Sequence, residues 1–199
     1  MLGMKILDEV KSKYNGNLRV VKSFGLGTYI QSDGLTQSGG IVETFWKQTL
    51  KKISHSTIQP FNNILILGLG GGTVTKIIRK LWPKAKITGV DIDSLIVDLG
   101  KKYLDLDADK IYIQDTADFN TKGYDLVIVD LYKGDMFPKK FEDEKFLKKL
   151  SQNKLVIFNR LYYKEKKSEA KEFGKKLNKV FKNVECFYPV TNLMYICSN

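Results

Sequence analysis

Glycines and carboxylates stand at the points where apolar segments of this chain end. The run Gly68–Gly72 (GLGGG) follows the apolar stretch 64–67, and Asp91 ends the predicted strand 86–91, 19 residues after Gly72. Glycine lets the backbone turn tightly and approach a ligand without Cβ collisions. A carboxylate at the end of the second strand can accept hydrogen bonds from ribose hydroxyls. The spacing therefore predicts that Asp91 binds the ribose of a nucleoside held at the glycine run.

Thr73 decides which nucleoside cofactor the glycine run favours. A dinucleotide fingerprint of the form GxGxxG starting at Gly68 requires a third glycine at position 73, where threonine stands instead. A turn without a ligand is disfavoured, because four glycines in five residues cost chain entropy with no gain in packing. The run therefore indicates a nucleoside cofactor other than NAD.

Two further aspartates, Asp115 and Asp130, follow apolar segments in the same way. Asp115 comes after 110–114, and its carboxylate could accept the exocyclic amine of an adenine or be an ordinary loop acid. Asp130 ends the run YDLVIVD (124–130), at the mouth of a parallel sheet where ligands bind. An amine of pKa about 10 is mostly protonated at neutral pH, so a carboxylate beside it could take its proton or hold the ammonium. Asp130 is therefore a candidate base, with a simple cofactor contact or a turn cap as the alternative.

The segments that would position these residues alternate between strand and helix. Strands are predicted at 64–67, 86–91, 110–114, 124–130 and 154–159, and helices at 73–81, 94–103 (N-cap Ser94), 141–150 and 165–181. The stretch 115–123 is too short for a full helix. The segments 184–190 and 193–197 predict a closing hairpin that makes the last strand antiparallel. The predicted fold class is α/β, a doubly wound seven-stranded Rossmann-type sheet with the C-terminal antiparallel hairpin of AdoMet-dependent methyltransferases.

The first part of the chain departs from this regular alternation. Short strands are predicted at 18–23 and 28–32 within an otherwise irregular region, and apolar residues at helical spacing predict a helix over 41–53. We therefore expect two parts. Residues 1–58 would form a small N-terminal β-cap with its lead-in helix, and residues 59–199 would form the AdoMet-type domain.

Composition narrows the class of partner. The net charge is +11, but only three of the 33 basic residues are arginine, the side chain whose fork suits phosphates and base edges. This favours a solvated lysine-rich surface, with nucleic acid as the alternative partner. No apolar run approaches the ~20 residues that span a membrane, and acidic residues among 1–10 argue against a signal peptide. We therefore expect a cytoplasmic protein without a membrane partner.

The cysteines and the single histidine argue against a metal site. Cys186 and Cys197 lie in apolar segments without a CxxC spacing, and His55 is distant from both in the sequence. We expect two buried thiols and no bound metal.

Taken in order, several of these segments resemble the spermidine synthase-like family of polyamine aminopropyltransferases. The matching segments are Ile64–Gly72, Val90–Asp93, Gln114-Asp115, Tyr124–Pro138 and Leu155–Asn159, together with Asp33–Ser38, which is similar to the family's DGxxQ segment. The resemblance extends over about residues 18–198. It implies a decarboxylated AdoMet donor and a diamine acceptor such as putrescine.

The resemblance also implies roles for individual residues. Gln37 would lie near the donor's tail, Asp91 on the ribose and Asp115 at the adenine, and Asp130 would be the base that faces the acceptor amine. The cofactor-binding residues predicted from motif and resemblance together are Gln37, Gly68, Gly70, Gly71, Gly72, Asp91, Ile92, Asp115 and Thr116, the substrate-binding residues are Tyr132 and Asp135, and the catalytic residue is Asp130.

Two positions differ from the family's pattern. The family's glycine loop has an acid, which binds the aminopropyl ammonium of the donor, where this chain has Gly71. Lys133 stands close to the position of a second acid in the segment after Asp130, and a lysine there would repel a cationic polyamine.

These observations predict a transferase that binds AdoMet or decarboxylated AdoMet and transfers a methyl or aminopropyl group to an unassigned small-molecule amine. A true polyamine aminopropyltransferase (spermidine synthase) is the first alternative. A nucleic-acid methyltransferase, suggested by the net charge and the Asp130-x-Tyr132 pattern, and a non-catalytic nucleoside-binding module are the further alternatives. A homodimer through the N-terminal β-piece, common in the family, is also left open.

Overall fold

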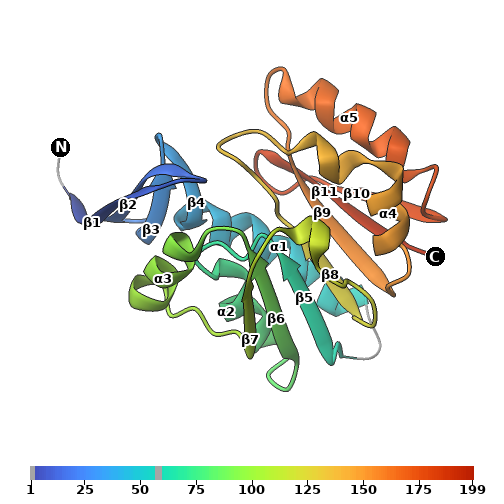
Figure 1. The fold of residues 1–199 in the computed structure, drawn as a ribbon, viewed down its shortest axis with the longest axis horizontal. Helices are drawn as coiled ribbons and strands as arrows, with labels where there is room; N and C mark the ends of the chain where they lie inside the picture. The colour runs from blue at the N-terminus through green and yellow to red at the C-terminus, as the bar shows by residue number, and fades with distance from the viewer. Residues whose placement is uncertain (1–2, 57–59) are drawn as a thin grey trace.

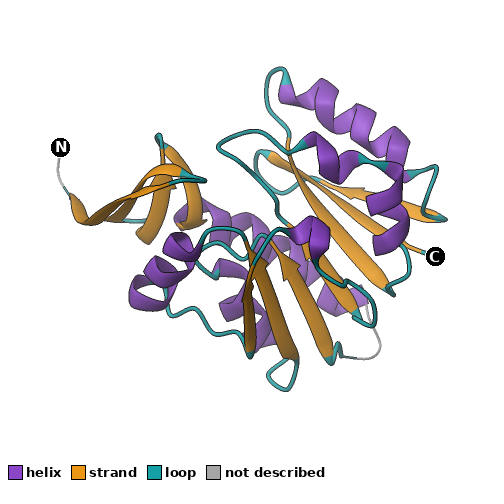
Figure 2. Cartoon of the chain, in the orientation of Figure 1, coloured by secondary structure: helices purple, strands orange, loops and turns teal. Residues whose placement is uncertain are grey.

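Two β-sheets organise the chain in the computed structural model, which describes residues 3–56 and 60–199. The first is a four-stranded antiparallel sheet in the order β1-β2-β3-β4. Its strands are β1 (Met4–Ser12), β2 (Gly16–Ser23), β3 (Gly27–Ser32) and β4 (Leu35–Gly39). Figure 2 shows this small sheet beside the larger one, next to the N-terminus of the chain.

The second sheet has seven strands in the order β10-β11-β9-β8-β5-β6-β7 (Figure 1). They are β5 (Asn63–Leu67), β6 (Lys86–Asp91), β7 (Lys110–Ile113), β8 (Leu126–Val129), β9 (Leu155–Leu161), β10 (Asn183–Phe187) and β11 (Asn192–Ser198). Strands β5 to β9 are parallel, and β11 is antiparallel to β9 and to β10. This confirms the predicted methyltransferase-type sheet. The strand order reverses between β5 and β8, which is where such sheets bind ligands.

The helices divide between the two faces of the large sheet (Figure 1). They are α1 (Gly40–Ser56), α2 (Thr73–Leu81), α3 (Ser94–Tyr103), α4 (Glu144–Leu150) and α5 (Lys166–Leu177). Successive side chains of a strand point to opposite faces. Ile64 and Ile66 of β5 therefore share one core with α1, α2 and α3, and Leu65 and Leu67 share the other with α4 and α5.

The N-terminal region is more regular than its sequence predicts, because β1 and β4 were not expected. The register of β1 against β2 shifts between Ile6 and Asp8, and such a bulge breaks the alternation that marks a strand. Strand β4 (LTQSG) has only one large apolar residue. The expected division between residues 58 and 59 lies outside the described residues.

Three local predictions are corrected. Asp93, not Ser94, is the N-cap of α3, because its carboxylate accepts the N–H of Leu95 at 3.0 Å. The helix expected over 141–150 begins at Glu144, after the short 3₁₀ helix η2 (Lys139–Glu142). Cys186 is exposed, although Cys197 is buried. The stretch 115–123 contains only the 3₁₀ helix η1 (Thr116–Asp118), as expected.

Two features are absent from residues 3–56 and 60–199. No helix there has both the length and the apolar character that crossing a membrane requires. No group of three or more His, Cys, Asp or Glu side chains there is arranged to hold a metal ion.

Candidate active site

A cavity of about 560 Å³ lies at the carboxyl ends of β5, β6 and β8 and extends to β4 and α1. Nine of the predicted site residues line it, namely Gln37, Gly68, Gly70, Asp91, Ile92, Asp115, Thr116, Asp130 and Tyr132. Its volume lies in the range of small-molecule sites, roughly 300–1,000 Å³. Three predicted residues, Gly71, Gly72 and Asp135, do not line it.

The glycine loop, residues 68–72, is tied to a strand on each side. The N–H of Gly70 donates to Oδ2 of Asp91 at 2.7 Å, which fixes the loop to the end of β6. The N–H of Gly71 donates to Oγ of Ser38 at 2.7 Å, which fixes it to β4 of the N-terminal sheet. Both sheets therefore hold the loop in its ligand-facing conformation.

Gly71 faces the protein interior rather than the cavity. A Cβ built on it would lie 2.8 Å from Cδ1 of Ile30 and 2.9 Å from Cδ1 of Leu104, closer than carbon atoms pack. Helix α3 also approaches from behind, since a Cβ on Gly100 would lie 2.6 Å from Cα of Gly71. An acid at this position could not reach the cavity unless the loop moved.

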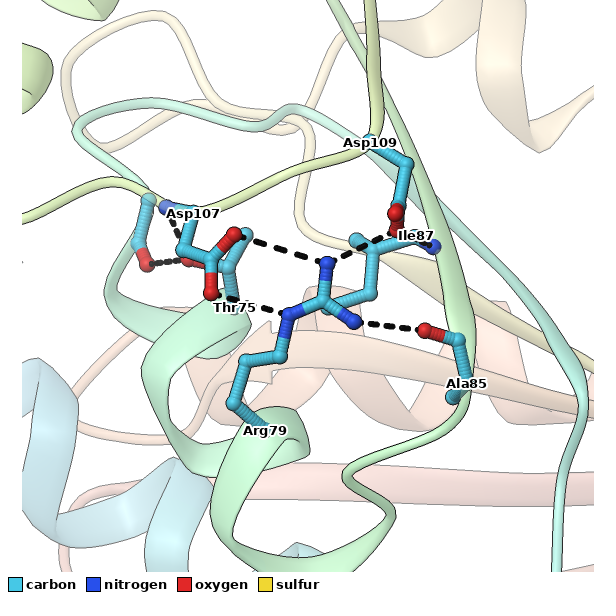
Figure 3. Close-up of polar contacts among 7 residues, drawn as sticks. Thr75, Arg79, Ala85, Ile87, Asp107 and Asp109 are labelled. Atoms are coloured by element: carbon cyan, nitrogen blue, oxygen red, sulfur yellow. Dashed lines mark hydrogen bonds and ion pairs between the residues drawn. The ribbon is translucent and has the colours of Figure 1, made fainter.

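Behind the loop, Arg79 of α2 holds the segment that follows α3 (Figure 3). Its guanidinium donates to Oδ2 of Asp107 at 2.9 Å and to Oδ2 of Asp109 at 2.8 Å. Leu106 lies between α3 and these aspartates and packs so closely on Gly72 that a Cβ there would overlap its side chain. The guanidinium therefore supports the rear wall of the glycine loop.

Asp91 lines the cavity at the end of β6 with only 9% of its surface exposed. Its Oδ1 accepts the N–H of Asp93 at 2.9 Å, and its Oδ2 accepts the N–H of Gly70 at 2.7 Å. Burial raises the pKa of Asp91 to about 6, and these backbone hydrogen bonds oppose the rise. Ribose hydroxyls would add donors to a carboxylate that burial destabilises, so the residues present fit a nucleoside.

Asp130 lies at the end of β8, next to the glycine loop. Its Oδ1 accepts a hydrogen bond from Nδ2 of Asn159 at 2.8 Å, and its Oδ2 accepts one from Nε1 of Trp46 at 2.8 Å. Burial raises the pKa of Asp130, and the hydrogen bonds from Asn159 and Trp46 oppose that rise. Two neutral donors thus orient the carboxylate without neutralising it, which suits a group that receives a proton.

Asp115 and Lys140 form an ion pair in the cavity wall. Asp115 also caps η1 by accepting the N–H of Ala117 at 2.9 Å. Burial alone would raise the pKa of Asp115, but the hydrogen bonds from Lys140 and Ala117 lower it below its usual value. An adenine amine at this position would share the carboxylate with Lys140.

The two predicted substrate-binding residues are placed differently from each other. The ring of Tyr132 lines the cavity, but its hydroxyl donates to the carbonyl of Asn159 at 3.1 Å and accepts the N–H of Leu161 at 2.9 Å. Asp135 points elsewhere, because its carboxylate pairs with Lys166 of α5 at 3.3 Å. Only the ring of Tyr132 is available to a substrate.

Ser38, Trp46, Lys140 and Asn159 contact predicted site residues but are absent from the prediction. Trp46 fits the helical spacing of α1, which predicts a core residue and no role in a site. The structure does bury it fully. Asn159 did have a signal, because it is a polar residue that ends the apolar run 155–158. The same pattern identified Asp91 and Asp130.

The strand order, the closing hairpin, the glycine loop and the acid at the end of the next strand define a class I AdoMet-dependent methyltransferase fold. Within that class, the family model of the spermine/spermidine synthase domain matches residues 43–195. The chain therefore belongs to the spermine/spermidine synthase family, a family of transferases. The resemblance seen in the sequence is confirmed.

Curated relatives and a solved structure agree with this assignment. The chain is 28% identical over 203 residues to the polyamine aminopropyltransferase of Clostridioides difficile (strain 630), covering 89% of this chain and 68% of the relative. It is 27% identical over 188 residues to that of Alkaliphilus oremlandii (strain OhILAs), covering 86% and 63%. The chain thus spans about two thirds of the length of these relatives. The probable spermidine synthase from Corynebacterium glutamicum ATCC 13032 shares the fold, with a TM-score of 0.80 at 17% identity, over 98% of this chain and 80% of that chain.

Proposed function

We propose that this protein transfers the aminopropyl group of decarboxylated AdoMet to a primary amine, as a polyamine aminopropyltransferase. The observation that supports this most is that Asp91 and Asp130 line one cavity, at the ends of the strands on either side of the glycine-loop strand β5. Asp91 is placed for the ribose of the donor and Asp130 for the amine of the acceptor. The names of the curated relatives support aminopropyl transfer over the broader alkyl transfer expected from the sequence.

The donor supplies an electrophilic carbon bound to a positively charged sulfur. The acceptor nitrogen forms a bond to that carbon while the carbon–sulfur bond breaks, and its electron pair stays on sulfur in the departing methylthioadenosine. Asp130 receives the proton of the acceptor amine, because its oxygens are held by Trp46 and Asn159 and no cation among the described residues pairs with it. The protein's main contributions are therefore proximity and a deprotonated amine.

Calorimetric titration with decarboxylated AdoMet, AdoMet, methylthioadenosine and NAD tests the donor half. We expect the adenosyl sulfur compounds to bind and NAD not to bind. Mass spectrometry after incubation with decarboxylated AdoMet and a primary amine tests transfer. Asp130→Asn keeps the shape of the side chain but removes the base, so turnover should fall roughly 100-fold or more while methylthioadenosine still binds. Failure of every adenosyl sulfur compound to bind would refute the proposal.

Methyl transfer from AdoMet is a second candidate, and Gly71 is the observation that favours it. The aminopropyl ammonium of the donor would require a carboxylate, and at this position any side chain would point into the core between Ile30 and Leu104. The two functions differ in donor, so turnover of one amine with AdoMet and with decarboxylated AdoMet separates them.

The homodimer and the nucleic-acid partner stay predictions. Exposed apolar side chains of the N-terminal sheet support a homodimer, since Phe24 is 97% exposed and Met4 is 61% exposed. Light scattering of Phe24→Ser beside the unchanged protein would test this. Retention of oligonucleotides that weakens steeply with salt would support nucleic-acid binding.

A further inference from the structure

The segment that follows β8 presents a lysine to the cavity where an acid was expected. Lys133 and Gly134 line the cavity, whereas Asp135 does not and pairs with Lys166 on α5. The turn is held by reciprocal backbone hydrogen bonds, with Lys133 N–H to Met136 O at 2.9 Å and Met136 N–H to Lys133 O at 3.1 Å. The structure thus reverses the charge that this segment offers to an acceptor.

Among residues 3–56 and 60–199, the charges that line the cavity leave Lys133 without an ion-pair partner. Among the described residues the lining carboxylates are Asp91, Asp115 and Asp130, and the lining cations are Lys133 and Lys140. Asp91 is bound to the glycine loop, and Asp115 is paired with Lys140. Lys133 forms no ion pair within residues 3–56 and 60–199, and neither does Asp130.

Within the part of the chain that the structure describes, the neighbours of Asp130 add no second carboxylate for a cationic acceptor. The polar residues that line the cavity beside β9 and β11 are neutral, namely Asn159, Tyr163, Thr191 and Asn192. The acceptor side therefore offers one carboxylate and one unpaired ammonium. A diamine would place one of its two ammonium groups near Asp130 and find no anion for the other.

We propose that the acceptor is an amine that also has a carboxylate at its other end, with its nitrogen facing Asp130 and its carboxylate facing Lys133. This rests on the proposed aminopropyl transfer to a primary amine, and it departs from the polyamine acceptor that the names of the curated relatives imply. Lysine is a compact charge that suits an anionic group, and like charges brought together in an interface are unfavourable. The reaction is unchanged, because only the nitrogen forms a bond and the carboxylate takes no part.

Three primary amines with the same number of carbon atoms test the proposal, namely 4-aminobutanoate, 1-aminobutane and 1,4-diaminobutane. Their binding to the protein saturated with methylthioadenosine is measured by calorimetry, independently of turnover. We expect 4-aminobutanoate to bind at least about tenfold more tightly than 1,4-diaminobutane, with 1-aminobutane between them. A preference for 1,4-diaminobutane would overturn the proposal. Product formation with decarboxylated AdoMet tests the proposed function separately, so transfer to none of the three counts against that function while the order of binding still decides the acceptor class.

Variants of Lys133 test whether this side chain causes the preference for 4-aminobutanoate. Lys133→Met should remove the advantage of 4-aminobutanoate over 1-aminobutane, and Lys133→Glu should make 1,4-diaminobutane the tightest binder. Lys171→Met makes the same change of charge at an exposed position of α5 that does not line the cavity, so the order should stay as in the unchanged protein. An unaltered order in both Lys133 variants would overturn the proposal.

The donor offers a second source of carboxylate, because AdoMet has one and decarboxylated AdoMet does not. Titration of both into the unchanged protein and into Lys133→Met distinguishes the two sources. We expect the variant to bind both donors as the unchanged protein does. Selective weakening of AdoMet would show that Lys133 binds the donor's carboxylate, which contradicts an acceptor role.

Discussion

The indole Nε1 of Trp46 donates a hydrogen bond of 2.8 Å to Oδ2 of Asp130, and 84 residues separate the two in the sequence. Asn159 donates to the other oxygen of Asp130 at 2.8 Å. Hydrogen bonds from neutral donors favour the carboxylate form without pairing it with a cation. The lead-in helix α1 therefore helps to orient a carboxylate at the end of a strand of the large sheet, although it comes before that sheet in the chain.

Trp46→Phe should make Asp130 harder to ionise. The variant keeps a ring in the core but removes one hydrogen bond that lowers the pKa of Asp130, so the net rise caused by burial becomes larger. A bond to a charged group contributes about 1.5–3 kcal/mol, and one pKa unit is about 1.4 kcal/mol. The acid limb of the plot of kcat/KM against pH should therefore shift to higher pH by about one pH unit.

Trp82→Phe is the matched control, because Trp82 is buried against Phe61 away from the cavity. Its acid limb should coincide with that of the unchanged protein. An acid limb that Trp46→Phe leaves in place would show that Asp130 is not the group that titrates in turnover.

Gly68→Ala should displace Asp130. Gly68 has φ +84°, and a Cβ there would overlap the carbonyl oxygen of Asp130. Gly123 has φ +87° but nothing within 4 Å of the same position. Both substitutions strain a left-handed backbone, by about 1 kcal/mol or more, and only the first also requires β5 and β8 to separate.

Activity and thermal unfolding are measured on both alanine variants. The difference between them reports the effect of the close approach of Gly68 to Asp130. We expect a similar small loss of stability from the strained backbone in each, with an additional loss of stability and of turnover in Gly68→Ala alone. Equal turnover in the two variants would contradict the close approach as a requirement of the site.

The ends of the strands could be predicted from the sequence, and the contacts made from elsewhere could not. Asp130 follows a continuous apolar run and Asp91 ends the predicted strand 86–91, and parallel strands place such ends at one edge of the sheet. Trp46 has no such signal in the sequence, because its spacing within a predicted helix already accounts for it as a core residue. Asp135 belongs to a turn, where the direction of a side chain depends on partners such as Lys166 that lie far away in the sequence.

The sequence predicts that a glycine loop is present. It does not predict which of the glycines face the cavity and which face the interior. Gly68 and Gly70 line the cavity, while Gly71 and Gly72 pack against Leu104 and Leu106. Neighbouring residues of this loop face different surroundings, and the packing of Leu104 and Leu106 decides which of them face the interior. The acid that the family has at position 71 therefore could not be restored here by substitution alone.

Arg79→Lys should weaken donor binding through the rear wall of the glycine loop. Lysine keeps the charge but cannot reach both Asp107 and Asp109 with a planar fork. The segment that holds Leu106 against Gly72 should then loosen, and the Kd of methylthioadenosine should rise by about tenfold, which corresponds to about 1.4 kcal/mol. Calorimetry measures this change directly.

Arg19→Lys is the control for Arg79→Lys, because Arg19 pairs with Glu9 on the surface, where both side chains are nearly half exposed. Exposed pairs contribute about 0–1 kcal/mol, so the Kd of methylthioadenosine should not change. A Kd that Arg79→Lys leaves unaltered, together with a lower unfolding temperature, would limit the role of Arg79 to stability.

Donor affinity should fall as the pH is lowered through about 6, the value to which burial raises the pKa of Asp91. The ionised carboxylate accepts both ribose hydroxyls, whereas the protonated acid loses an acceptor site. Methylthioadenosine has no net charge in this range. Calorimetry should show that its affinity does not change with pH above pH 7 and decreases below pH 6.

The contribution of Asp91 to folding stability should change in the opposite direction with pH. The folded-state pKa of Asp91, about 6, lies above the ordinary value of 3.8, so the folded state binds more protons between these two values. The contribution of Asp91 to the free energy of unfolding therefore decreases as pH rises from about 4 to about 6. Asp91→Asn should abolish the pH dependence of donor affinity, bind donor weakly at every pH and remove this one contribution to the pH dependence of stability, while Asp98→Asn, on the exposed face of α3, should change neither. A donor affinity that stays constant from pH 7.5 to pH 5 in the unchanged protein would mean that Asp91 is not the ribose ligand.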